Sequence, residues 1–85
     1  MTATITNRLS FIRGGMAYLN SRSHKAGLRA AIKAAGVYNL PNGSASRDDV
    51  LQAALRVYPE STYRMHDRQL NDAVIAAAEA WTSGS

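Results

Sequence analysis

The chain has 85 residues, none of them cysteine, and a formal net charge of +4. A chain this short forms one domain with a small core, and the absence of cysteine excludes disulfides and thiolate metal sites. Its 46% hydrophobic content argues against disorder, and no apolar run approaches the length of a membrane span. We therefore expect a soluble, cytoplasmic all-α domain over residues 1–81 and a flexible tail over residues 82–85.

The charges are divided unevenly along the chain. The first 47 residues hold seven basic residues and no acid, a charge of +7, whereas the remainder holds three basic residues and six acids, a charge of −3. A like-charged segment repels itself in the folded state, so another interaction must favour it. The division predicts an anionic partner, or pairing of the basic half with the acidic half within the fold.

An amphipathic first helix is predicted over residues 5–20. Its apolar stripe advances by steps of 4, 3, 4 and 3 residues and consists of Ile5, Leu9, Ile12, Met16 and Leu19. Gly14 and Gly15 interrupt this helix, at a cost of about 1 kcal/mol each relative to alanine. We interpret the glycines as a bend or as the close approach of a crossing helix. The alternative is a true break that makes two short helices.

The second helix begins after Ser21 or Ser23, because either hydroxyl is a suitable N-cap. Gly36 stands at the position where a left-handed glycine ends a helix. The expected buried face consists of Leu28, Ala31, Ile32 and Ala35. A loop follows, and we expect Tyr38 and Leu40 to pack beneath it.

A third helix is predicted over residues 47–58. Ser46, followed by Asp49, resembles a capping box, and Pro59 prevents the helix from continuing. The expected inner face consists of Val50, Leu51, Ala54, Leu55 and Tyr58.

The last helix begins near Ser61 or at Asp67 and ends near Trp81. Its apolar stripe consists of Leu70, Val74, Ala77 and Trp81. A surface of small residues accompanies the stripe and consists of Ala73, Ala76, Ala77, Ala78 and Ala80. Such a surface indicates tight internal packing or, alternatively, a homodimer seam. The expected fold is an all-α compact bundle of four short helices, or five if the first helix is broken.

Four basic residues of the second helix, Arg22, Lys25, Arg29 and Lys33, are spaced to share one face. Like charges at this spacing repel, and positive charge at a helix start opposes the helix dipole. This conflict with local preference favours an anion site at the helix start, extended along a polyanion by the two later cations. The predicted binding residues there are Ser21, Arg22, Ser23, His24, Lys25, Arg29 and Lys33. The alternative is a solvated face that pairs internally.

The last two helices also suggest a helix-turn-helix. The turn would span residues 59–62, and Arg64 and Arg68 would share one face of a recognition helix. A plain helical hairpin has the same pattern, and the turn lacks the usual glycine.

The sequence offers no support for catalysis. His24 and His66 lie in different elements, no metal-ligand spacing occurs, and no phosphate-binding glycine loop is present. We expect a non-enzymatic protein without metal or cofactor, most simply a nucleic-acid-binding regulator or accessory factor. The alternative is an inhibitor or adaptor of the phage or mobile-element type that docks on an acidic protein surface, with Phe11, Tyr18 or Tyr63 as its apolar anchor.

Overall fold

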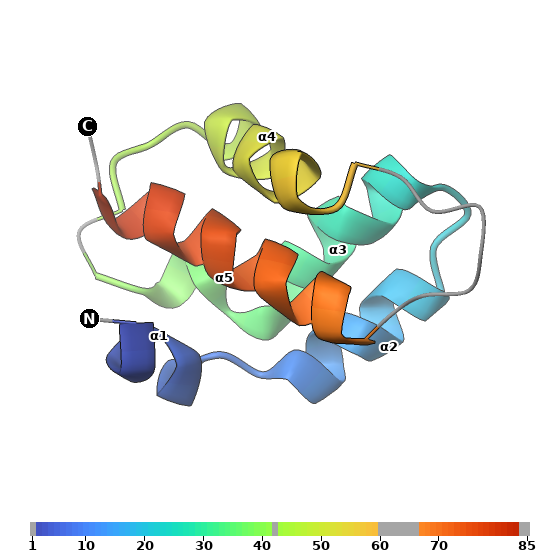
Figure 1. Cartoon of the computed structure of the whole chain (residues 1–85), viewed down its shortest axis with the longest axis horizontal. Coiled ribbons are helices and arrows are strands. Elements are labelled where there is room, and N and C mark those ends of the chain that lie inside the picture. Colours follow the sequence, from blue (N-terminus) through green and yellow to red (C-terminus); the bar gives the residue numbers. More distant parts are fainter. Residues whose placement is uncertain (1, 42, 60–66, 84–85) are drawn as a thin grey trace.

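The computed structural model describes residues 2–41, 43–59 and 67–83, which form five α-helices, one 3₁₀ turn and no strand. The elements are α1 (Thr2–Arg8), α2 (Phe11–Leu19), α3 (His24–Ala35), η1 (Val37–Asn39), α4 (Arg47–Val57) and α5 (Asp67–Ser83). α2 packs along α3 and α4 packs along α5, while α5 also contacts α1, α2, α3 and η1 (Figure 1). The radius of gyration, 11.4 Å, is close to the roughly 12 Å expected for a globular chain of this length. The predicted all-α, compact fold is confirmed.

The predicted first helix is divided in two, but at Leu9-Ser10 and not at the glycines. The Ser10 hydroxyl accepts a hydrogen bond from the Arg13 N–H and so caps α2, while the Ser10 N–H donates to the Ala35 carbonyl at 2.9 Å. A serine cap and a backbone bond to α3 both favour a new helix start at this point. Gly14 lies inside α2, where an added Cβ would be 3.2 Å from the Ala31 carbonyl oxygen of α3. The close approach of a crossing helix is therefore confirmed.

This division turns part of the predicted apolar stripe outward. Leu9 is buried, but Ile12, Met16 and Leu19 are 80%, 60% and 65% exposed. The prediction of one continuous helix with this stripe on a single face was wrong, because Ser10 interrupts the helix and changes the direction of the residues after it. α2 instead packs Phe11 and Tyr18 against the core.

α3 follows its predicted capping signals. Ser23 is the N-cap and accepts from the Ala26 N–H, and Gly36 ends the helix with φ +94°, a left-handed conformation that favours glycine. The predicted buried face is confirmed, since Leu28, Ala31 and Ile32 have no exposed surface. The opposite face, which carries the cations, points to solvent.

α4 and α5 complete the core as predicted, with Val50, Ala54 and Tyr58 fully buried on one side and Leu70 and Val74 on the other. Ser46 caps α4 by accepting from the Asp49 N–H at 3.0 Å. α5 continues to Ser83, so the helix extends two residues into the predicted tail. Its alternative start at Ser61 falls in residues 60–66, outside the described part of the chain.

Trp81, the only tryptophan of the chain, connects the end of α5 to the loop after η1. The Trp81 indole N–H donates to the Leu40 carbonyl at 3.2 Å, and the Trp81 ring meets the Tyr38 ring edge-on at 5.1 Å. Gly43 lies directly against the indole, where a side chain would collide with it. The prediction that Tyr38 and Leu40 pack beneath the loop is confirmed, since Leu40 is buried and Tyr38 half-buried.

Among residues 2–41, 43–59 and 67–83, no helix is both long and apolar enough to cross a bilayer.

Three alanines of the predicted seam on α5, Ala73, Ala77 and Ala78, have no exposed surface. These three alanines therefore serve internal packing and are not available to a partner, whereas Ala76 and Ala80 are half-buried.

Candidate functional site

Lys25, Arg29 and Lys33 share one face of α3, as their spacing predicts, whereas Arg22 precedes the Ser23 cap and lies outside the helix. Arg22, Lys25, Arg29 and Lys33 are all exposed. Within the described residues no carboxylate lies within 4 Å of a basic group, so the expected internal pairing of the two halves does not occur there. The repulsion along this face is therefore not relieved by an ion pair inside the described fold.

Two members of this face line a concavity of about 350 Å³ between α3, η1 and α4. Arg29 and Lys33 come from α3, and Arg47 comes from the first turn of α4. The remaining lining residues are Tyr38, Asp48 and Leu51. Three cations and one carboxylate give this concavity a net charge of +2.

Arg47 is held in place by an aromatic ring. Its guanidinium carbon lies 4.4 Å from the centre of the Tyr38 ring, a cation–π contact. Burial raises the pKa of the Tyr38 hydroxyl above its usual 10.0, and the positive charges of Arg47 and Arg29 partly oppose that rise. The contact leaves the guanidinium at the rim of the concavity, where its N–H groups can face a bound anion.

A second concavity of about 430 Å³ adjoins the first and is formed where α1, α2 and the end of α3 meet. Arg8, Arg13 and Lys33 supply its charge, and Ser10 and Asn39 supply further polar groups. No carboxylate lines it. Because Lys33 lines both concavities, they form one continuous surface with five cations. We call Arg8, Arg13, Arg29, Lys33 and Arg47 the Lys33 surface.

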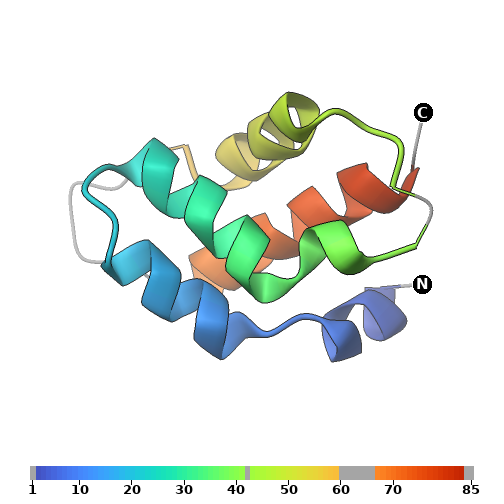
Figure 2. The same cartoon turned by 180° about the vertical axis from the view of Figure 1, so that it is seen from behind.

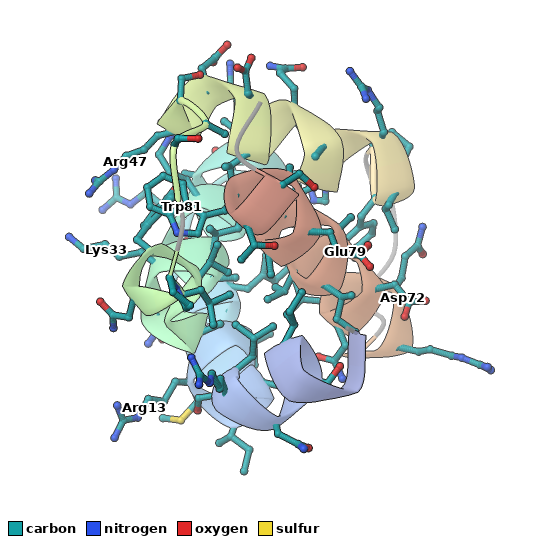
Figure 3. The ribbon with its side chains drawn as sticks, turned by 90° about the vertical axis from the view of Figure 1, so that its left-hand side faces the viewer. Arg13, Lys33, Arg47, Asp72, Glu79 and Trp81 are labelled. Atoms are coloured by element: carbon teal, nitrogen blue, oxygen red, sulfur yellow. The ribbon has the colours of Figure 1, made fainter. Side chains whose placement is uncertain are left out.

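Two acids of the second half, Asp72 and Glu79, lie on the side of the molecule away from the Lys33 surface, whereas Asp48 lines its first concavity. In Figure 3, Arg13, Lys33 and Arg47 project from one side and Asp72 and Glu79 from the opposite side. The basic side is the one on which α3 faces the viewer in Figure 2. Part of the charge division along the sequence is therefore also a division in space, which leaves a basic face in which Asp48 is the acid of the first concavity.

Comparison with known proteins assigns this chain to no family. No family model, no curated protein and no solved structure matches it.

The predicted anion site at the start of α3 is only partly assembled. The Ser21 hydroxyl donates to the Ala17 carbonyl at 2.9 Å, and the Ser23 hydroxyl caps α3. Both serines are therefore already engaged within the fold. Arg22 and Lys25 remain exposed and continue the basic face beyond the Lys33 surface.

His24 has a structural role. Its Nε2 bonds the Tyr58 carbonyl at 2.5 Å and its Nδ1 bonds the Tyr18 hydroxyl at 2.8 Å. Because a carbonyl only accepts, Nε2 carries the proton, and in the neutral ring the Tyr18 hydroxyl donates to Nδ1. The His24 ring also meets the Tyr58 ring edge-on at 4.5 Å. His24 therefore joins α2, α3 and α4, and the prediction that it binds an anion is not supported by this geometry.

Tyr18 owes its position to the absence of a side chain at Gly27. An added Cβ on Gly27 would lie 2.6 Å from the Tyr18 ring. Burial, followed by the influence of the neighbouring Tyr58, raises the pKa of Tyr18 to about 12. The Tyr58 hydroxyl disfavours ionisation of Tyr18. It is itself buried and has no hydrogen-bond partner within the described fold.

The helix-turn-helix hypothesis gains little from α5. Residues 60–66, which hold most of the predicted turn and Arg64, lie outside the described residues. The exposed described side chains of α5 are Arg68, Asp72, Glu79 and Ser83. Two acids and one arginine would meet the phosphates of a groove unfavourably. Unlike the Lys33 surface, the exposed side chains of the described part of α5 include more acids than cations. This part of α5 therefore does not resemble a recognition helix.

Sequence reasoning identified Arg29 and Lys33 but missed Arg8, Arg13, Arg47 and Tyr38. The three arginines all belong to the acid-free first 47 residues, so the charge division was the available signal. Their convergence depends on how α1, α2 and α4 pack around the end of α3. Among the described residues, no group of three potential metal ligands occurs.

Proposed function

We propose that this protein is a non-enzymatic binding module that binds nucleic acid through the Lys33 surface. The observation that carries the proposal is the convergence of five cations, from the four helices α1 to α4, on two adjoining concavities that share Lys33. Phosphate groups are recognised by arginine and lysine, and a continuous basic surface suits an extended polyanion better than a single ion.

The energetics of the face support the same proposal. Arg22 and Lys25 stand in or beside the first turn of α3, where positive charge is unfavourable, and they gain no ion pair within the described fold. A bound phosphate backbone would relieve the repulsion along the face and release counterions. Arg22 and Lys25 would then extend the contact beyond the Lys33 surface, in the direction of the α3 start.

The competing function is an inhibitor or adaptor that docks its basic face on an acidic protein. Such a protein interface needs an apolar anchor beside the charges. Two of the three anchors named from sequence, Phe11 and Tyr18, pack against the core, and Tyr63 lies outside the described residues. None of these three is an exposed described residue, but Ile12, Met16 and Leu19 are exposed on α2, so the salt dependence of binding is what separates the two functions.

The test is the salt dependence of binding to a short labelled DNA duplex and to an RNA of equal length. If all five cations of the Lys33 surface contact phosphates of duplex DNA, the plot of log affinity against log salt should have a slope of about −4.5. Arg29→Gln/Lys33→Gln should make that slope less negative by about 2. Both residues are exposed, so the fold should be retained.

The matched control is Arg56→Gln/Arg68→Gln, which removes the same charge from exposed residues outside the surface. Arg56 lies nine residues after Arg47 and therefore on the opposite face of α4. Equal losses of affinity in the two double variants would show that binding depends only on the net charge of the protein. No binding to either nucleic acid at low salt would refute the proposal and favour an acidic protein partner.

A further inference from the structure

The first concavity of the Lys33 surface contains one group that a phosphate backbone alone would not favour. Asp48 lines it together with Arg29, Lys33 and Arg47. The Asp48 side chain is exposed, and no basic group of the described residues lies within 4 Å of its carboxylate. A carboxylate repels phosphates, accepts hydrogen bonds and donates none. Its presence among three cations therefore favours a ligand that offers hydrogen-bond donors as well as negative charge.

The same concavity also combines room for a small ring system with an apolar lining. Its volume of about 350 Å³ falls within the range of about 300–1,000 Å³ that is typical of small-molecule sites. The buried Leu51 and the half-buried Tyr38 supply the apolar part of the lining. A phosphodiester backbone needs neither feature, whereas an unstacked nucleobase needs apolar contact for its faces and polar groups at its edges.

Among the common bases, guanine matches the donors and acceptors of this lining. Its Watson–Crick edge has two adjacent donors, the N1–H and the N2 amino group, which suit the two oxygens of one carboxylate. Its O6 and N7 are acceptors, and arginine and lysine are their usual partners. Adenine, cytosine, uracil and thymine place an acceptor beside the donor on the same edge, where it would face a carboxylate oxygen unfavourably.

We propose that the first concavity binds an unpaired guanine of a single-stranded nucleic acid. Asp48 accepts from the N1–H and the N2 amino group, while Arg29, Lys33 and Arg47 donate to O6, N7 and the neighbouring phosphates. The inference rests on the proposed function, because the remaining cations of the Lys33 surface hold the strand beyond that guanine. In a duplex the same edge is paired with cytosine, so only an unpaired guanine can reach Asp48.

The test compares short labelled single strands that differ in one base, by fluorescence anisotropy at low salt. One uridine strand carries a central guanosine, and the other carries inosine, which lacks the N2 amino group but keeps N1–H, O6 and N7. The wild type should bind the guanosine strand about tenfold more tightly, the effect of one hydrogen bond to a charged group. Annealing each strand to its complement should remove the difference.

Asp48→Asn and Asp49→Asn form a matched pair of variants. Both acids are exposed in the first turn of α4, so either change removes one negative charge and the same favourable interaction with the helix dipole. Of the two, Asp48 lines the concavity. Asp48→Asn should bind the two strands within about twofold of each other, whereas Asp49→Asn should keep the preference of about tenfold.

The outcomes distinguish the guanine site from nucleic-acid binding in general. Equal binding of the guanosine and inosine strands by the wild type would overturn the guanine site and leave nucleic-acid binding intact. The same holds for a guanine preference that Asp48→Asn and Asp49→Asn share. No binding to any strand or duplex would overturn both proposals. Guanosine monophosphate should compete only at far higher concentration than the guanosine strand. Competition at equal concentration would overturn the single strand as the source of the guanine and indicate a free nucleotide.

Discussion

Two glycines with opposite surroundings provide a sharp test of the packing between α2 and α3. Both Gly15 in α2 and Gly27 in α3 are helical, so alanine at either position gains up to about 1 kcal/mol of helix propensity. At Gly15 the new methyl group meets nothing within 4 Å. At Gly27 it would lie 2.6 Å from the Tyr18 ring. The two substitutions are chemically identical, but the structure predicts that Gly15→Ala raises the free energy of unfolding and Gly27→Ala lowers it.

The magnitude at Gly27 follows from what holds Tyr18 in place. The ring stacks on Tyr58 with centres 6.0 Å apart, and its hydroxyl bonds His24, so it cannot move without disturbing both contacts. Overpacking costs about 1–3 kcal/mol, and loss of the hydrogen bond costs about 0.5–1.5 kcal/mol more. After the gain in propensity, Gly27→Ala should lose about 2 kcal/mol of unfolding free energy. Gly15→Ala should gain up to about 1 kcal/mol.

Thermal unfolding followed by circular dichroism measures both effects. For a domain of this size, 1 kcal/mol corresponds to about 4–8 °C, so Gly27→Ala should melt about 8–16 °C below wild type and Gly15→Ala up to about 8 °C above it. Gly15 lines an apolar groove between α2 and the start of α5, so the melting temperature should be measured at two protein concentrations. A Gly27→Ala protein at least as stable as wild type would refute the described packing of Tyr18 against α3.

Three further predictions concern the core, the charges and the response to alkali. Leu28→Ala should cost about 2–5 kcal/mol, as for other fully buried leucines, and a chemical unfolding curve within experimental error of wild type would contradict its burial. Arg22→Gln/Lys25→Gln should leave the melting temperature unchanged or raise it, because these charges oppose the α3 dipole, and a lower value would indicate an internal ion pair. The raised pKa of Tyr18, about 12 against 10.0, means that the folded state holds this proton more tightly. Its stabilising contribution is complete below pH 10 and is lost as the pH rises to about 12. Urea unfolding across that range should therefore show stability falling with pH, less steeply in Tyr18→Phe.

Local signals located most of the helix ends correctly. Ser23, Gly36 and Ser46 each satisfy backbone groups of the nearest helix end, so their effect is decided within a few residues and can be read from sequence. Ser10 acts in the same way but was missed, because a regular apolar stripe continues past it. The stripe was interpreted as one helix, although its second half faces outward.

The sequence predicted that the site is basic, but it did not predict which residues form it. The charge division indicated a basic face, and the 3.6-residue period placed Arg29 and Lys33 on it. Which arginines join them depends on the packing of α1, α2 and α4 around α3, which no single segment determines. The structural role of His24 was missed for the same reason. Its two partners, Tyr18 and Tyr58, lie 6 and 34 residues away in the sequence, and only the fold brings them together.

The position of Trp81 gives this protein a built-in optical reporter. It is the only tryptophan, its ring meets Tyr38 edge-on, and Tyr38 in turn carries the Arg47 guanidinium at the rim of the first concavity. An anion that draws Arg47 away from Tyr38 would change the electric field at the indole. The fluorescence emission of Trp81 in the unlabelled protein should therefore change when an anion occupies that concavity, because the indole contacts Tyr38 and Tyr38 contacts Arg47.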